Sequence, residues 1–181
     1  MNSSPRPLAI VSGGSRGLGF ETARGLAARG YDLALIAKDV ARLSVAKDQL
    51  LAEFSASQSG VSITTHAADL ESQAATRKVA EEINASLPTA QVMVLAHGVM
   101  SEKMSKTLRT TDAEWNRVMA INLDSVFTLV NVIAPAMADA RDGRLVIYSA
   151  CLGRMSGPGN AGGLAPYRIS KAGVNALVRN L

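Results

Sequence analysis

Short runs of apolar residues alternate along the chain with longer segments in which apolar residues recur every three or four positions. The runs predict buried strands, and the periodic segments predict helices with one apolar face. The predicted strands are 8–11, 33–37, 61–67, 92–96 and 145–148. The predicted helices are 18–29, 40–54, 71–86, a long one from the capping box Thr111–Glu114 toward 140, and a last one that begins near 167 and still runs at 181.

This alternation predicts an α/β fold with a doubly wound, Rossmann-like parallel sheet covered by helices on both faces. No linker divides the sequence, so we expect one dinucleotide-binding domain over residues 1–181. The fold is expected to be incomplete if the chain stops inside its last helix.

Composition narrows the class of protein. The chain has 181 residues, 48% apolar, with a net charge of +4 and only one Trp, three Tyr and three Phe. The basic residues are scattered and aromatic platforms are few, so no nucleic-acid partner is expected. The sequence contains no run of 18 apolar residues, so no membrane-spanning helix is expected. No metal site is expected either. The first seven residues lack a secretory apolar stretch, and the single Cys151 is typical of a reducing compartment, so we predict a cytoplasmic protein.

A glycine-rich segment, Ser12-Gly-Gly-Ser-Arg-Gly-Leu-Gly19, joins the first predicted strand to the first helix. A diphosphate needs close approach to bare backbone at a helix N-terminus, which supplies free N–H donors. The segment therefore predicts a dinucleotide-binding turn, although a plain glycine-rich turn has the same spacing. The cofactor-binding residues predicted here are Gly13, Ser15, Arg16, Gly17, Leu18 and Gly19.

The end of the second strand bears on the choice of cofactor. Enzymes that bind the ribose 2′-hydroxyl of NAD place a carboxylate there. Here Ala37 is followed by Lys38, and Arg16 supplies a second cation, so we predict NADP, with NAD possible. If the strand ends two residues later, Asp39 becomes the strand-end acid instead.

Tyr167 and Lys171 lie four residues apart in the last predicted helix, which places them on one face. A nearby ammonium, together with the positive nicotinamide, is expected to favour the phenolate and to lower the tyrosine pKa, so that the tyrosine can exchange a proton with a substrate oxygen. Asn122 lies mid-helix among apolar residues, where an amide is locally unfavourable. Asp69 follows the third strand and is expected to cap the third helix.

The glycine spacing G-x-x-x-G-x-G, followed in order by Asp69, Asn122 and the Tyr167/Lys171 pair, resembles the short-chain dehydrogenase/reductase family. The resemblance covers residues 8–181. It implies that Tyr167 is the acid–base catalyst and that Lys171 also holds the ribose hydroxyls. It implies that Asn122 holds a water at a helix distortion. The alternative for Asn122 is a core amide bonded to neighbouring backbone. It further implies that Asp69 contacts the adenine. Leu70, Ala96 and Gly98 complete the predicted cofactor site.

The sequence departs from the family pattern in three places. The family's catalytic serine position holds Ala150, so we assign the role to Ser149, one residue earlier, with Ser156 a further candidate. Leu95-Ala-His-Gly98 replaces the family's N-N-A-G, and His97 either substitutes for an asparagine or lies at the rim. The chain also stops where family members add two strands and a substrate lid, so we expect a fragment, a truncated chain or a short relative.

The resemblance implies an NADP(H)-dependent oxidoreductase that interconverts a small-molecule carbonyl and a secondary alcohol. It also implies a homo-oligomer, because the last helix and the long helix before it commonly form a dimer face. The competing hypothesis is a non-catalytic nucleotide-binding or partner-binding relative, favoured by Ala150 and the altered fourth strand. The substrate itself is not predicted.

Overall fold

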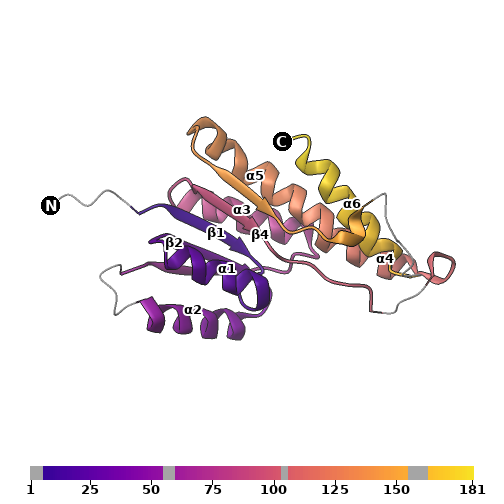
Figure 1. Cartoon of the computed structure of the whole chain (residues 1–181), viewed down its shortest axis with the longest axis horizontal. Coiled ribbons are helices and arrows are strands. Elements are labelled where there is room, and N and C mark those ends of the chain that lie inside the picture. The colour runs from indigo at the N-terminus through magenta and orange to yellow at the C-terminus, as the bar shows by residue number, and fades with distance from the viewer. Residues whose placement is uncertain (1–5, 55–59, 103–105, 155–162) are drawn as a thin grey trace.

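A computed structural model describes residues 6–54, 60–102, 106–154 and 163–181, and within them the strands form one parallel sheet (Figure 1). The strands are β1 (Leu8–Ser12), β2 (Asp32–Ala37), β3 (Ile63–Ala67), β4 (Val92–Leu95) and β5 (Arg144–Ile147), in the order β3-β2-β1-β4-β5. Each predicted strand is confirmed to within two residues. The winding reverses between β1 and β4, and ligands bind outside the carboxyl ends of strands at such a point.

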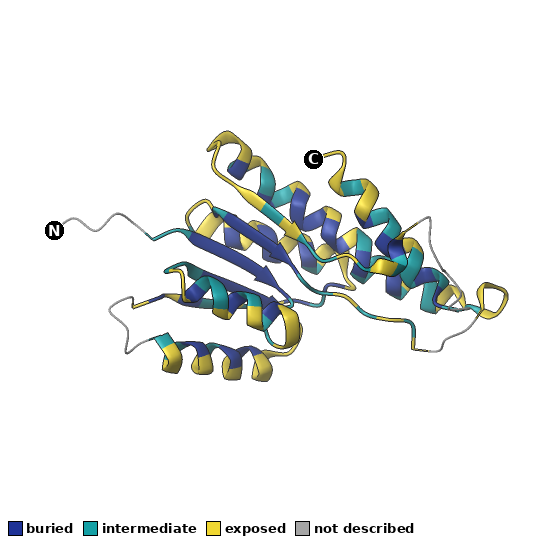
Figure 2. Ribbon diagram, in the orientation of Figure 1, coloured by how far each residue is buried: buried dark blue, intermediate teal, exposed yellow. Residues whose placement is uncertain are grey.

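Helices cover both faces of the sheet, as predicted. Successive strand residues point to opposite faces because the side-chain period is two. Ala9, Val11, Leu33 and Leu35 face the layer formed by α1 (Gly17–Ala27) and α2 (Val40–Phe54). Ile10, Ala34 and Ile36 face α3 (Gln73–Ser86), α5 (Ser125–Asp139) and α6 (Ala165–Val178). Figure 2 shows the buried central strands between these layers, with the more exposed β5 at the sheet edge.

The predicted long helix is present, but its middle changes winding. Thr111 accepts a hydrogen bond from the Glu114 amide and begins α4 (Asp112–Met119), as the capping box predicts. The π-helix η2 (Ala120–Asp124) then joins α4 to α5, which contains Pro135. Single π turns inside α-helices occur frequently at functional sites, and this one contains Asn122.

Two predicted helix ends were wrong. Asp69 does not cap α3; the hydroxyl of Ser72 does, accepting from the Ala75 amide. The last helix does not run to the end of the sequence but ends at Val178, where the Asn180 side chain donates to the Ala176 carbonyl. The start of α3 is set by a side chain that bonds backbone locally, a signal that apolar periodicity does not carry.

The continuous helix Asp112–Asp139 is long and apolar enough to cross a membrane, with a mean hydropathy of 1.6, although no uninterrupted apolar run predicted it. Its apolar residues Val126, Leu129 and Ile133 belong to the buried core against the sheet. Core packing accounts for this composition.

Candidate active site

The turn between β1 and α1 brings bare backbone against its neighbours. Gly13 has a φ of +72°, and a Cβ there would lie 2.9 Å from the backbone nitrogen of His97. Gly17 has a φ of +58° where the turn enters α1. Gly19 is tighter still, because its Cβ would lie 2.2 Å from the Gly13 carbonyl oxygen. Gly13 and Gly19 therefore leave no room for a side chain, so the turn presents bare backbone near the N-terminus of α1, which suits a diphosphate.

Gly19→Ala is expected to lower the free energy of unfolding by about 3 kcal/mol, since the new methyl group must displace the Gly13 backbone. Gly25→Ala is the matched control in the same helix. Its Cβ would meet only the flexible Arg29 side chain, at 3.5 Å, so a gain of about 0.5 kcal/mol is expected from helix propensity. Urea denaturation of both variants measures the difference, and equal effects would show that the close approach at Gly19 is unimportant.

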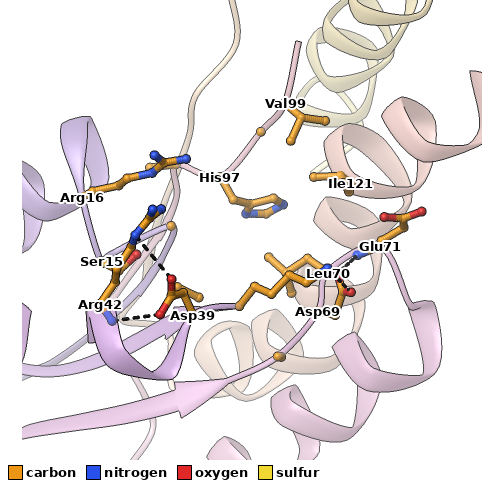
Figure 3. A pocket seen from close by; sticks show the side chains of 16 residues that line it. Ser15, Arg16, Asp39, Arg42, Asp69, Leu70, Glu71, His97, Val99 and Ile121 are labelled. Carbon is orange, nitrogen blue, oxygen red and sulfur yellow. Dashed lines mark hydrogen bonds and ion pairs between the residues drawn. The ribbon is translucent and has the colours of Figure 1, made fainter. Parts of the chain in front are cut away.

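A crevice of about 620 Å³ lies at the carboxyl ends of the central strands (Figure 3). The predicted cofactor residues in its lining are Gly13, Ser15, Arg16, Lys38, Asp69, Leu70, Ala96 and Gly98. Of the other turn residues, Leu18 lines a smaller adjacent crevice, and Gly17 and Gly19 shape the turn without lining either one. Sequence reasoning missed the charged Arg42 and Glu71 as well as the apolar Val99 and Ile121 in the lining, because none of the four belongs to a recognisable motif.

The position at which β2 ends distinguishes the NADP hypothesis from the NAD hypothesis, and β2 ends where the sequence predicted. Ala37 is the last residue of β2, so Asp39 is not the strand-end acid. Its carboxylate instead accepts from the Arg42 amide at 3.0 Å and pairs with the Arg42 guanidinium at 3.3 Å, at the start of α2. Asp39 is therefore engaged in its own turn.

Lys38 and Asp69 pair across the ends of β2 and β3, with 2.6 Å between the ammonium and a carboxylate oxygen. This hydrogen bond and the attraction between the charges raise the pKa of Lys38 and hold that of Asp69 below its ordinary value. Both groups are exposed, so the pair adds little to stability. Arg16 lies across the crevice in Figure 3, and among the described residues no ion pair engages its guanidinium.

Tyr167 and Lys171 share one face of α6 and line the smaller crevice, of about 180 Å³. The two crevices have a common wall, formed by residues 96–99 at the end of β4. Lys171 is buried, and its ammonium donates to the Tyr148 carbonyl at 2.8 Å. Burial lowers the pKa of Lys171.

The lysine alone does not lower the tyrosine pKa as expected, and the contribution expected from the nicotinamide charge stays a prediction. Burial, followed by electrostatic repulsion from the nearby Cys151 side chain, raises the pKa of Tyr167. The reason is that the Lys171 ammonium is turned toward the Tyr148 carbonyl, which leaves burial to oppose the phenolate. Tyr167 therefore holds its proton at neutral pH.

Asn122 is fully buried in the π-helix, as the expected helix distortion places it. Its amide accepts from the Val99 N–H at 2.8 Å and donates to the Val99 carbonyl at 2.9 Å and to the Ser170 hydroxyl at 3.1 Å. The alternative of a core amide bonded to backbone is thus confirmed. A water-holding role for Asn122 stays a prediction. The second lone pair of its amide oxygen is left to accept a hydrogen bond from a water.

Ser149, rather than Ala150, lines the small crevice beside Tyr167 and Lys171. Its hydroxyl donates to the Lys171 carbonyl at 3.3 Å, which ties the end of β5 to α6. The other serine candidate, Ser156, lies outside the described residues. The placement of Ser149 favours its assignment, and its catalytic role stays a prediction.

His97 does not lie loose at the rim but bonds at both ring nitrogens. Nδ1 is 2.5 Å from the Ser12 hydroxyl, and Nε2 is 2.7 Å from the Ser125 hydroxyl. Burial, followed by the positive charge of Lys171, lowers the pKa of His97 to about 4. The ring is therefore neutral at physiological pH.

This neutrality predicts an acid-sensitive fold. The folded-state pKa lies below the ordinary 6.5 of an unfolded histidine, so the unfolded chain binds more protons between pH 6.5 and 4. Stability from this group is then fully present above pH 6.5 and is lost as the pH falls toward 4, by at most about 3 kcal/mol. Urea denaturation at a series of pH values measures this loss. His97→Gln should flatten the dependence, whereas an unchanged slope assigns it to other groups.

The comparisons with known proteins agree with this geometry. The family described as short chain dehydrogenase matches residues 7–181, so the chain belongs to the short-chain dehydrogenase family. It is 32% identical over 175 residues to the 3-oxoacyl-acyl-carrier-protein reductase FabG of Escherichia coli, covering 96% of this chain and 65% of that protein. It is 31% identical to a galactitol 2-dehydrogenase of Cereibacter sphaeroides, covering 96% of this chain and 63% of that protein. The chain thus spans slightly less than two thirds of the length of these relatives.

Solved structures give the same result for the fold. A metagenomic short-chain oxidoreductase in complex with NADP superposes with a TM-score of 0.84 at 30% identity, covering 96% of this chain and 74% of that one. A short-chain dehydrogenase from Sphingobium yanoikuyae in complex with NADPH superposes with a TM-score of 0.83 at 24% identity, covering 97% and 64%. The doubly wound sheet is therefore the family fold, represented here in part.

Proposed function

We propose that this protein is an NADP(H)-dependent oxidoreductase that interconverts a carbonyl and a secondary alcohol of a small molecule. The observation that carries the proposal is the pair Tyr167 and Lys171 in a crevice that shares a wall with the larger crevice over the glycine turn. A nucleotide on that turn would extend toward this pair. The named activities of the relatives, a reductase and a dehydrogenase, support the same class of reaction.

The residues present fit a phosphorylated dinucleotide. Gly13 and Gly19 leave bare backbone where a Cβ would clash, and the Arg16 and Lys38 cations line the crevice. Asp69 and Leu70 line the same crevice at the end of β3 and are assigned to the adenine end. The bound cofactor would supply or accept a hydride.

Tyr167 carries out the proton transfer in this proposal. In the reductive direction its phenol gives a proton to the carbonyl oxygen as hydride adds to the carbonyl carbon, which completes the alcohol. The raised pKa of Tyr167 supports this direction, because the proton is present at neutral pH. Lys171 would stabilise the phenolate that forms once its ammonium turns from the Tyr148 carbonyl toward the phenol. Ser149 orients the substrate oxygen, and Asn122 holds the wall beside Lys171.

The direct test is NADPH oxidation by the purified protein across a panel of ketones and aldehydes, followed at 340 nm. Turnover that depends on both NADPH and a carbonyl supports the proposal. The rival, a binding protein without chemistry, predicts calorimetric binding of NADPH and no turnover. Self-association through α5 and α6 also stays a prediction, supported by the exposed apolar side chains Phe127 and Ile169 on those helices.

The Lys38 ammonium is expected to bind the 2′-phosphate after leaving Asp69. Lys38→Asp should lower the preference for NADPH over NADH about tenfold or more, since a charge-assisted hydrogen bond is lost and a like charge replaces it. Lys47→Asp makes the same charge change on α2, away from the crevice lining, and should leave the preference within about twofold. The ratio of the two dissociation constants measures the effect, and an unchanged ratio in Lys38→Asp removes Lys38 from the site.

A further inference from the structure

The hydrogen bonds around His97 have a fixed direction. The Ser125 hydroxyl donates to the Ile121 carbonyl at 2.7 Å, so its oxygen must accept from His97 Nε2–H at 2.7 Å. In a neutral imidazole the other nitrogen is then an acceptor. The Ser12 hydroxyl consequently donates to Nδ1, 2.5 Å away. The four groups form one continuous chain from Ser12 to the Ile121 carbonyl.

This chain crosses the molecule at the point where the two halves of the site meet. Ser12 ends β1 and directly precedes Gly13 of the cofactor turn, and it is fully buried. Ser125 is also buried and directly follows the π-helix that contains Asn122. His97 lies between them in the wall common to both crevices.

A second set of polar contacts continues from the π-helix to α6. Asn122 bonds both backbone groups of Val99, two residues after His97, and also bonds Ser170, next to Lys171. Hydrogen bonds and short stretches of backbone therefore link the glycine turn, the end of β4, the π-helix and the helix with the Tyr/Lys pair. His97 supplies the side-chain hydrogen bond of this set that reaches Ser12 at the start of the turn, beside the backbone bond from the Ala96 amide to the Ser12 carbonyl.

We propose that His97 is a positioning residue that holds the cofactor turn in register with the helix carrying Tyr167 and Lys171. The inference rests on the proposed function, because the register matters for a hydride donor on the turn and a proton donor on α6. The rigid imidazole reaches both hydroxyls at once. Neither a shorter nor a longer amide does so, because an Asn side chain reaches the position of Nδ1 and a Gln side chain that of Nε2.

This difference in reach allows each half of the link to be removed separately. His97→Asn should keep the Ser12 bond and lose the Ser125 bond, so NADPH binds within twofold of the parent while kcat falls about tenfold. His97→Gln should keep the Ser125 bond and lose the Ser12 bond, so the Kd for NADPH rises about fivefold, the effect of one hydrogen bond. His66→Gln, in β3 outside both crevices, is the control and should change neither value. A Kd and a kcat that move together in both His97 variants, or do not move, would overturn the proposal.

A second measurement uses the parent protein alone, so it does not depend on whether a variant folds. Nitrogen-15 NMR of the parent protein at pH 7 should show His97 as a neutral ring with the proton on Nε2, and only one other histidine is present to be distinguished. A charged ring or an Nδ1–H form overturns the inference. If the parent binds NADPH but shows no turnover, the proposed function fails. Two measurements then still decide whether His97 links the turn to the π-helix. They are the difference in Kd for NADPH between His97→Asn and His97→Gln, and the tautomer of His97 seen by NMR.

Discussion

Tyr167→Phe is expected to lower kcat for carbonyl reduction about 10²- to 10⁴-fold, the usual contribution of a positioned general acid. The substitution removes only the hydroxyl group, so the ring still fills its place on α6 beside Lys171. The Kd for NADPH should stay within about twofold, because the turn and crevice that hold the cofactor are unchanged. Stopped-flow NADPH oxidation and a fluorescence titration measure the two values separately.

Tyr148→Phe is the matched control, because Tyr148 lines the same small crevice. Its hydroxyl is 2.9 Å from the Thr22 hydroxyl, which in turn donates to the Leu18 carbonyl. Removing it should lower stability by about 1 kcal/mol and leave kcat within a few-fold of the parent. Retention of full activity in Tyr167→Phe, or an equal loss in both variants, would contradict the assignment of the proton donor.

The pH dependence separates the two directions of the reaction. Because the pKa of Tyr167 is raised, the protonated form needed for reduction persists into alkaline solution, whereas the phenolate needed for oxidation is scarce at neutral pH. Alcohol oxidation by this chain should therefore gain more than carbonyl reduction as the pH rises above 8. Cofactor charge near the phenol would shift both curves to lower pH together.

The fold could be predicted from sequence because its signals are periodic and local. A continuous apolar run, such as the one from Leu8, indicates a strand buried on both sides. A spaced apolar pattern, such as the one from Val40 to Phe54, indicates a helix buried on one side. Both elements have the predicted limits to within two residues. The start of α3 was misplaced because a single side-chain hydrogen bond, from the Ala75 amide to the Ser72 hydroxyl, decides it. Such bonds depend on geometry that a one-dimensional pattern does not contain.

Much of the candidate site could be predicted for a different reason. The glycine spacing and the four-residue interval between Tyr167 and Lys171 are imposed by backbone approach and helix pitch, and both are visible in the sequence. Side chains that act through partners far along the chain were not visible. Ser12 and His97 are 85 residues apart, and nothing in the sequence around Ser125 marks it as their partner. The direction of the Tyr167 pKa shift was missed for the same reason, because it depends on where the Lys171 ammonium points.

Asn122→Ala is expected to lower the free energy of unfolding by about 3 kcal/mol, because the Val99 amide and carbonyl and the Ser170 hydroxyl each lose a partner. In a chain of this size that corresponds to a fall in Tm of about 6–12 °C. The position has no exposure to solvent, so water cannot replace the amide without opening the π-helix. Calorimetry or circular dichroism melting measures the change.

Asn116→Ala makes the same substitution on the exposed surface of α4 and should change stability by about 0.5 kcal/mol or less. The comparison separates the buried hydrogen bonds of Asn122 from the general effect of alanine in a helix, which is favourable at both positions. Equal Tm values for the two variants would show that Val99 and the π-helix are held by other contacts. A large loss confined to Asn122 would instead establish that the helix distortion is maintained by this amide, and that the wall beside Lys171 depends on it.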